Sequence, residues 1–305
     1  MQIRSLVALS AFGLAACSVR HVRSTDGSTD GGGSVGAASG TLALDQQQPN
    51  VAPSAFNARQ RLDASTRHGE WDIIHTGPGD SVRAWVVYPE RSTNAPVVLV
   101  VHEIFGESTW IRAVADQLAA DGYIAIAPDL LTGRVPLQAD TATQQDATAA
   151  IAKLNPADVQ RQLTAVGKWG MALPAAQKKY GIVGFCWGGG TSFKHAIESP
   201  EGLGAAVVYY GPMGDADIAR LSSVKVPVLG LYGGADQRVD ATIPRIDSIM
   251  KAQGKTYEPH VFDGAGHGFL RAQTNNAGAA MPANAEAARQ AWPLTIGWFR
   301  KYLGS

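Results

Sequence analysis

The feature that most constrains the fold is an uninterrupted apolar run at positions 96–101, Pro-Val-Val-Leu-Val-Val. A strand with one face in water alternates apolar and polar residues, whereas a continuous β-branched run is typical of a strand buried on both faces of a parallel sheet. At 305 residues the chain is long enough to bury such a strand in a sizeable core. The run therefore predicts a strand inside a parallel α/β sheet.

Predicted strands and helices alternate along the rest of the chain. The strands are expected at 71–75, 82–88, 96–101, 123–127, 181–185, 205–210, 226–232 and 256–262, and the helices at 109–120, 143–154, 156–171, 243–252 and 284–302. The first two strands flank the turn Gly77-Pro78-Gly79-Asp80 and look like an antiparallel entry into the sheet. The later alternation predicts a doubly wound, mostly parallel sheet with helices on both faces.

The N-terminus has the build of a secretory signal. Arg4 precedes an apolar stretch at 6–14, and the small residues Ala15 and Ala16 precede Cys17. The stretch is shorter than the roughly 20 residues of a spanning helix. Leu14-Ala15-Ala16-Cys17 resembles the bacterial lipobox, which implies cleavage before Cys17 and acylation of its thiol. We expect 1–17 to be a signal peptide and the protein to be exported and lipid-anchored through Cys17 on the periplasmic side of a bacterial membrane; an ordinary cleaved signal and a cytoplasmic start are the alternatives.

Composition separates a linker from a folded domain. Residues 18–62 are rich in Gly, Ser, Thr, Asp and Gln, with too little apolar surface to offset the entropy of ordering, so we expect a flexible tether there and a folded domain over 63–305. The 26 basic and 26 acidic side chains cancel, so no global field favours a polyanion such as nucleic acid. No protein partner is evident from the sequence.

Cys186 is the first candidate for chemistry. The chain has two cysteines, and if Cys17 is acylated or removed, Cys186 is a lone thiol; a disulfide between them would require the signal to be retained. Cys186 lies in Gly184-Phe185-Cys186-Trp187-Gly188-Gly189, where an apolar strand ends and a helix should begin. This Gly-x-nucleophile-x-Gly turn exposes a nucleophile at the edge of the sheet, and the helix N-terminus favours a thiolate. The alternative is a buried structural cysteine in a glycine-rich turn.

Two further residues complete a predicted triad. Asp236 follows one apolar strand and His267 follows the next. In a hydrolase with this kind of elbow, the acid and the histidine come after the nucleophile along the chain. Taken singly, Asp236 could be a helix cap or turn residue and His267 a surface loop histidine. Their joint placement after successive strands favours a Cys186–His267–Asp236 triad.

From about residue 70 to the C-terminus the chain resembles the dienelactone hydrolase family. The resemblance rests on four motifs in order: His102-Glu103-Ile104-Phe105-Gly106, Pro128-Asp129-Leu130, the stretch 184–189 around the cysteine, and the stretch 264–269 around the histidine. It implies an α/β-hydrolase fold with a cysteine nucleophile. It also implies that Glu103 contacts the thiol and helps to deprotonate it when substrate binds; the alternative is an idle carboxylate at a strand end. We further predict that Glu103 keeps the resting thiol protonated until substrate arrives.

The same resemblance suggests how the substrate is held. The oxyanion hole would consist of the backbone N–H groups of Ile104 and Trp187. Family members bind a substrate carboxylate with arginines, which Arg271 matches and which Arg134 matches less closely; both could instead be solvated surface residues. Gly268 departs from the serine expected beside the histidine, which puts the dienelactone substrate itself in doubt.

These residues predict a hydrolase that cleaves a small-molecule lactone or carboxylic ester, including one that carries a carboxylate. The alternatives are a general carboxylesterase and a non-catalytic binding lipoprotein on a hydrolase scaffold. No cofactor and no metal are expected, because the sequence has no Cys-x-x-Cys, no His-Glu-x-x-His and no calcium loop.

Overall fold

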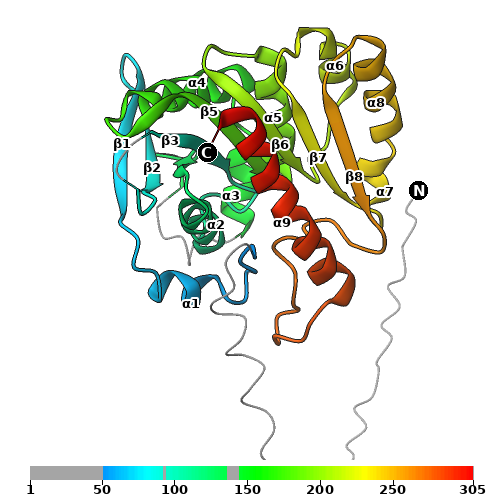
Figure 1. Cartoon of the computed structure of the whole chain (residues 1–305), viewed down its shortest axis with the longest axis horizontal. Helices are drawn as coiled ribbons and strands as arrows, with labels where there is room; N and C mark the ends of the chain where they lie inside the picture. Colours follow the sequence, from blue (N-terminus) through cyan, green and yellow to red (C-terminus); the bar gives the residue numbers. More distant parts are fainter. Residues whose placement is uncertain (1–50, 92–93, 136–143, 305) are drawn as a thin grey trace, which may run out of the picture. The chain divides into compact units, whose positions relative to one another are not determined.

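A computed structural model describes residues 51–91, 94–135 and 144–304 of the chain. The predicted signal, Cys17 and the tether up to residue 50 lie outside these residues. The described part contains one eight-stranded sheet with helices packed around it (Figure 1). The strands are β1 (Gly69–Gly77), β2 (Asp80–Val87), β3 (Ala95–Val101), β4 (Ile124–Asp129), β5 (Ala176–Phe185), β6 (Leu203–Tyr209), β7 (Val228–Gly233) and β8 (Tyr257–Phe262).

The helices follow the expected alternation, with several short additions. They are α1 (Ala58–Asp63), α2 (Thr109–Ala120), α3 (Gln144–Ile151), α4 (Pro156–Ala172), α5 (Trp187–Glu198), α6 (Asp215–Ile218), the 3-10 turn η1 (Leu221–Ser223), α7 (Gln237–Asp240), α8 (Ile243–Ala252) and α9 (Pro282–Leu303). The ends of α2 and α8 are the predicted ones. A side-chain cap explains the start of α2, since the Ser108 hydroxyl accepts a hydrogen bond from the Ile111 N–H.

Strand order confirms the mostly parallel sheet. The strands lie in the order β1-β2-β4-β3-β5-β6-β7-β8, and every neighbouring pair from β4 to β8 is parallel. The first hairpin, β1 with β2, is antiparallel, and β2 pairs antiparallel with β4. The predicted antiparallel entry is therefore confirmed, and the carboxyl ends of β3, β5, β6, β7 and β8 meet at one edge of the sheet.

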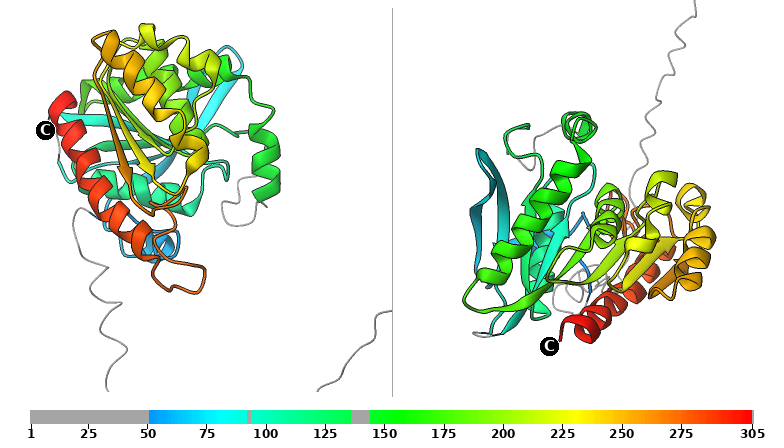
Figure 2. Two further views of the ribbon diagram at one scale, coloured as in Figure 1. Left: turned by 90° about the vertical axis from the view of Figure 1, so that its right-hand side faces the viewer. Right: turned by 90° about the horizontal axis from the view of Figure 1, so that it is seen from above.

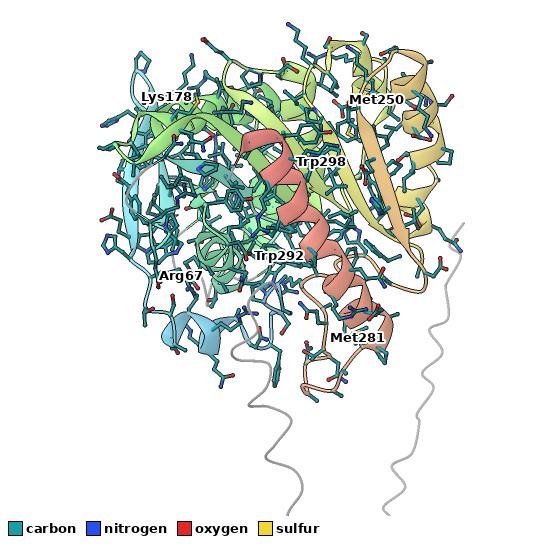
Figure 3. The ribbon with its side chains drawn as sticks, in the orientation of Figure 1. Arg67, Lys178, Met250, Met281, Trp292 and Trp298 are labelled. Atoms are coloured by element: carbon teal, nitrogen blue, oxygen red, sulfur yellow. The ribbon has the colours of Figure 1, made fainter. Side chains whose placement is uncertain are left out.

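Helices cover both faces of the sheet (Figure 2), and an apolar layer lies beneath them on each face. Alternate residues of β3 point to opposite faces, so Val98 and Val100 pack with α2 and α9, whereas Val97, Leu99 and Val101 pack with α4, α5 and α8. This is the burial on both faces that the apolar run predicts. Figure 3 labels the two tryptophans of α9, Trp292 and Trp298; Trp292 is fully buried and donates its indole N–H to Asp121 at 2.9 Å.

The predicted boundary of the tether needs correction. Residues 51–57 and α1 belong to the folded domain, with Ala52 and Ala58 buried in the core layer that holds α2 and α9. The Trp110 indole N–H donates to the Pro53 carbonyl at 2.8 Å. The predicted tether over 18–62 therefore extends too far at its C-terminal end, because a polar composition conceals the few apolar residues that dock.

Candidate active site

The candidate site residues gather at one edge of the sheet. Glu103 follows β3, Cys186 follows β5, Asp236 follows β7 and His267 follows β8. All four strands run in the same direction, so their carboxyl ends bring these residues together although they are far apart in the sequence. Cys186, His267 and Glu103 line one cavity of about 530 Å³.

Cys186 occupies a strained turn between β5 and α5. Its φ of 55° and ψ of −116° lie outside the regions that side-chain-bearing residues ordinarily adopt. The turn is possible because glycines surround it: a Cβ at Gly184 would lie 2.0 Å from the Gly188 carbonyl oxygen, and one at Gly188 would lie 2.4 Å from the Val101 carbonyl oxygen. This is a sharp strand-to-helix turn of the kind that a nucleophile elbow requires.

The environment of the thiol favours its protonated form. Burial raises the pKa of Cys186, and the nearby Glu103 carboxylate raises that pKa further. Hydrogen bonds from the backbone N–H groups of Trp187 and Ile104 act in the opposite direction. The two backbone groups predicted as oxyanion donors therefore lie near the thiol.

The loop that supplies the Ile104 donor is held by its neighbours. The His102 ring is fully buried, stacks on Trp187 with centroids 5.4 Å apart, and its Nδ1 lies 2.8 Å from the Glu103 carbonyl oxygen. Because that partner is a carbonyl, Nδ1 must be the donor. Gly106, with a φ of 74°, closes the turn by donating its N–H to the same carbonyl at 3.2 Å. The loop is therefore a rigid turn, which suits a fixed backbone donor.

Asp236 and His267 form a direct pair. The Asp236 carboxylate is buried, and its Oδ2 lies 2.5 Å from Nδ1 of His267. The aspartate thereby occupies Nδ1 and leaves Nε2 as the ring nitrogen available to the cavity. The Tyr210 ring meets the imidazole edge to face at 5.1 Å and holds its plane.

Glu103 is a buried carboxyl with a cationic neighbour. Its side chain is 5% exposed, and its Oε2 lies 3.3 Å from Nε of Arg271. The Arg271 guanidinium also stacks over the Phe105 ring at 4.7 Å. Burial raises the pKa of Glu103 to about 7, and Arg271 limits the rise. The carboxyl can therefore gain or lose a proton near neutral pH.

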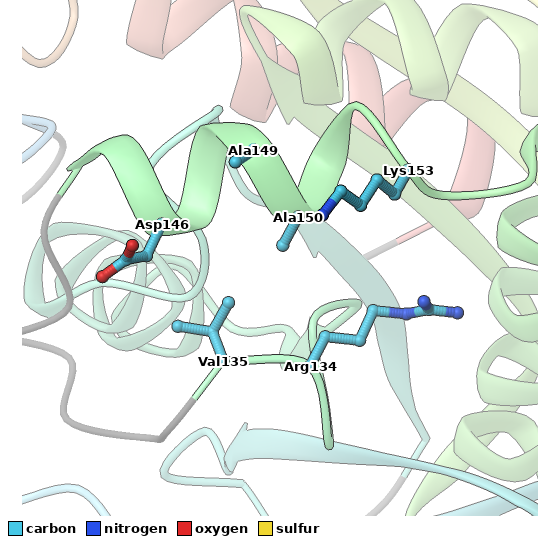
Figure 4. Close-up of a pocket in the computed structure, with 6 residues that line it drawn as sticks. All are labelled: Arg134, Val135, Asp146, Ala149, Ala150 and Lys153. Atoms are coloured by element: carbon cyan, nitrogen blue, oxygen red, sulfur yellow. The ribbon is translucent and has the colours of Figure 1, made fainter.

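The structure does not bring Arg134 to this cavity. Arg134 is exposed and lines a separate pocket of about 470 Å³ together with Val135 and residues of α3 (Figure 4). The chain turns back after β4, where the Leu131 carbonyl accepts the Arg134 N–H at 2.9 Å. Of the two predicted carboxylate-binding arginines, only Arg271 lines the cavity with Cys186.

Two residues of the site were not predicted from the sequence. Arg238 lines the cavity two residues after Asp236, and Tyr210 lies fully buried at the end of β6 with a φ of 41°. Both follow strands whose carboxyl ends reach the same edge. Their position after a strand is the signal that could have suggested them, but the sequence does not show which side chains of a loop point into the site.

Neither a metal site nor a membrane span is found in the described part of the chain. Its histidine, cysteine, aspartate and glutamate side chains form no group of three or more that could hold a metal ion. None of its helices is both long and apolar enough to cross a bilayer.

Comparisons with known proteins identify the family of the chain. The model of the dienelactone hydrolase family matches residues 82–303. Proteins named "Putative carboxymethylenebutenolidase" are similar in sequence. The one from Methylorubrum extorquens AM1 is 34% identical over 72% of this chain and 77% of its own length. The one from Escherichia coli O157:H7 is 33% identical over 86% of this chain and 98% of its own length. The crystal structure of a Klebsiella pneumoniae protein named "Putative Dienelactone Hydrolase" superposes with a TM-score of 0.67 and 27% identity, over 78% of this chain and all of that one.

Proposed function

The chain belongs to the dienelactone hydrolase family and is a hydrolase with the α/β-hydrolase fold, and from this we propose that it cleaves a lactone or carboxylic ester through a Cys186–His267–Asp236 triad. The observation that carries the proposal is the position of the thiol. The Cys186 sulfur lies on the strained elbow, near the backbone N–H groups of Ile104 and Trp187 and in a cavity that His267 also lines. Such a site can bind a carbonyl next to a nucleophile.

The steps follow from these positions. The Cys186 sulfur attacks the carbonyl carbon, and the resulting oxyanion accepts hydrogen bonds from the Ile104 and Trp187 N–H groups. His267 receives the thiol proton and passes it to the leaving alkoxide, while Asp236 stabilises the imidazolium that forms in between. Water, deprotonated by His267, then attacks the thioester, which releases the acid and restores the thiol.

In this proposal, Glu103 controls the protonation of the Cys186 thiol in the free enzyme. Its charge and the burial of the sulfur both disfavour a thiolate in the free enzyme, and its ion pair with Arg271 holds the carboxylate beside the thiol. A substrate that engages Arg271 would release Glu103 to act as a second proton acceptor. A protonated resting thiol also reacts more slowly with oxidants.

Replacement of the nucleophile tests the mechanism. We expect Cys186→Ala to lower kcat/KM for a neutral aryl ester by about 10³-fold or more, because only binding and the oxyanion donors remain. Circular dichroism of the purified variant checks that it folds. Full esterase activity in Cys186→Ala would rule out the triad.

Alkylation tests the role of Glu103. We expect iodoacetamide to modify Cys186 slowly at neutral pH in the free enzyme and faster in Glu103→Gln, which removes the negative charge beside the sulfur. Rapid alkylation of the unmodified enzyme, with no acceleration in Glu103→Gln, would contradict this role.

Two other functions remain as outcomes of these tests. A general carboxylesterase would hydrolyse neutral and anionic esters equally, and Arg271→Ala would not change that ratio. A binding protein that has lost turnover would bind esters or lactones without cleaving any of a broad panel. The paired Asp236 and His267 favour an enzyme over the second alternative.

A further inference from the structure

Two arginines line the cavity around Cys186, and their surroundings differ. Arg271 has a partner, since its guanidinium lies beside the Glu103 carboxylate and over the Phe105 ring. Arg238 is exposed and, within the described residues, has no hydrogen bond, ion pair or ring contact. The cavity therefore presents one guanidinium whose donors are not used by the protein.

The two guanidinium groups are placed on opposite sides of the nucleophile. Cys186 follows β5, which has β3 on one side and β6 and β7 on the other. Arg271 reaches back to Glu103 and Phe105 of the loop after β3. Arg238 lies on α7, directly after β7. A ligand that spans the thiol can therefore meet a cation at either end.

The charges of the lining favour an anion at the free end. The described residues that line the cavity include two arginines but only one carboxylate, Glu103, which is partly protonated at neutral pH because its pKa is raised to about 7. Burial raises the pKa of the Cys186 thiol and the Arg238 charge partly offsets that rise, so the guanidinium lies within electrostatic reach of the reacting atom. Much of the remaining lining is apolar, with Ile104, Trp187 and Pro212. Apolar walls strengthen a charge-assisted pair between a guanidinium and a carboxylate.

We propose that Arg238 binds an anionic group of the substrate on the β7 side of Cys186, so that this enzyme prefers esters or lactones that carry a carboxylate at that end. The proposal rests on the proposed hydrolase function. It assigns Arg238 as an anchor for the substrate rather than a participant in proton transfer. It also replaces Arg134, which lines a different pocket, as the second arginine of the site.

Two matched pairs of esters test the preference. In the first pair, 4-acetoxybenzoate and 4-acetoxybenzamide differ in charge on the leaving group; in the second, the phenyl esters of 4-carboxybenzoate and 4-carbamoylbenzoate differ in charge on the acyl group. We expect kcat/KM to favour the anionic member of at least one pair by about 10- to 100-fold, the range of one charge-assisted hydrogen-bonded contact. Arg238→Gln should abolish that preference, through a rise in KM for the anionic ester that is larger than any change for the neutral one.

Two variants act as controls. Arg238→Lys keeps the charge and should restore part of the preference. Arg134→Gln removes an exposed arginine of a separate pocket and should leave kcat/KM for both the anionic and the neutral ester unchanged. A wild-type enzyme with no preference in either pair, or a preference that survives in Arg238→Gln, would overturn the proposal.

A measurement without turnover separates this proposal from the hydrolase function. Benzoate and the neutral benzamide are compared as protectants of Cys186 against iodoacetamide, with modification of the Cys186 peptide followed by mass spectrometry. We expect half-protection at an at least tenfold lower concentration of benzoate, and we expect Arg238→Gln but not Arg134→Gln to remove the difference. If no ester is cleaved but this result holds, the hydrolase proposal fails and the anion site stands; equal protection by both compounds means that the anion site fails.

Discussion

At the scale of single residues, the Glu103 carboxyl makes folding depend on pH. Its pKa rises from an ordinary 4.5 to about 7 because the side chain is buried. Between these values the unfolded chain releases the proton while the folded protein keeps it, so the folded state binds more protons and its stability falls as pH rises. Above about pH 7 the loss is complete. The free energy of unfolding lost in this way is at most about 3 kcal/mol.

Glu103→Gln should remove this part of the pH dependence. We expect the free energy of unfolding of the variant to match that of the wild type at pH 4.5 or below and to exceed it by up to about 3 kcal/mol at pH 8, because the amide carries no charge to bury. Urea denaturation at both pH values measures the difference. Glu201→Gln, at an exposed turn, is the matched control. A Glu103→Gln variant that is less stable than the wild type at pH 8 would show that the ion pair with Arg271 outweighs burial.

At the scale of elements, Gly184 beside the elbow and Gly297 in the last helix differ in whether a side chain could replace the glycine hydrogen. A Cβ on Gly184 would lie 2.0 Å from a backbone oxygen of α5, whereas a Cβ on the exposed Gly297 of α9 would meet no atom within 4 Å. The elbow therefore requires glycine at position 184, whereas the glycine at position 297 only lowers the stability of α9.

The substitution Gly184→Ala should accordingly destabilise the protein by about 3 kcal/mol or more and abolish hydrolysis, since α5 must move away from β5. Gly297→Ala should raise the free energy of unfolding by about 1 kcal/mol, or Tm by about 2–4 °C, with activity unchanged. Thermal melts with an ester assay compare them. Similar melting temperatures for the two variants would contradict the close approach at the elbow.

The segment 51–57 is an element that supports the site from outside. The Ala55 N–H donates to the Arg271 carbonyl at 2.9 Å, and the Gln273 side-chain amide donates to the Ala52 carbonyl at 3.0 Å. Ala52 and Ser54 are buried. These contacts hold the backbone next to the Arg271 side chain, which itself lines the cavity.

Two truncations test this support. Removal of residues 1–50 should leave the domain at its full stability, whereas removal of 1–57 should lower the free energy of unfolding by about 2–4 kcal/mol, because buried contacts and several hydrogen bonds are lost. The longer truncation should also raise KM for an ester that uses Arg271. Calorimetry and steady-state kinetics on both proteins provide the comparison. Equal melting temperatures would show that the docked segment contributes nothing.

At the scale of the whole molecule, the sequence predicts the sheet and the triad for one physical reason. Continuous apolar runs identify parallel strands, and parallel strands bring their carboxyl ends together, so Cys186, Asp236 and His267 could be placed at one edge without coordinates. The side chains of loops do not obey such a rule. Arg134, which follows β4, lines a different pocket, and Arg238 and Tyr210 stayed unassigned because no periodic pattern identifies a loop residue that points inward. The docking of 51–57 depends on a few contacts that composition cannot detect.

The two cysteines allow a prediction for the full chain. We propose that Cys17 carries a lipid and that Cys186 carries the chemistry, since Cys17 follows the lipobox-like Leu14-Ala15-Ala16 and Cys186 follows β5. In bacterial cells fed an alkyne analogue of palmitate, the wild type and Cys186→Ser should be labelled, whereas Cys17→Ser should not be. Ester hydrolysis by the purified proteins should show the complementary pattern, with Cys17→Ser active and Cys186→Ser strongly impaired. Labelling that persists in Cys17→Ser would exclude acylation at this cysteine, and an unlabelled wild type would favour an ordinary cleaved signal or a cytoplasmic start.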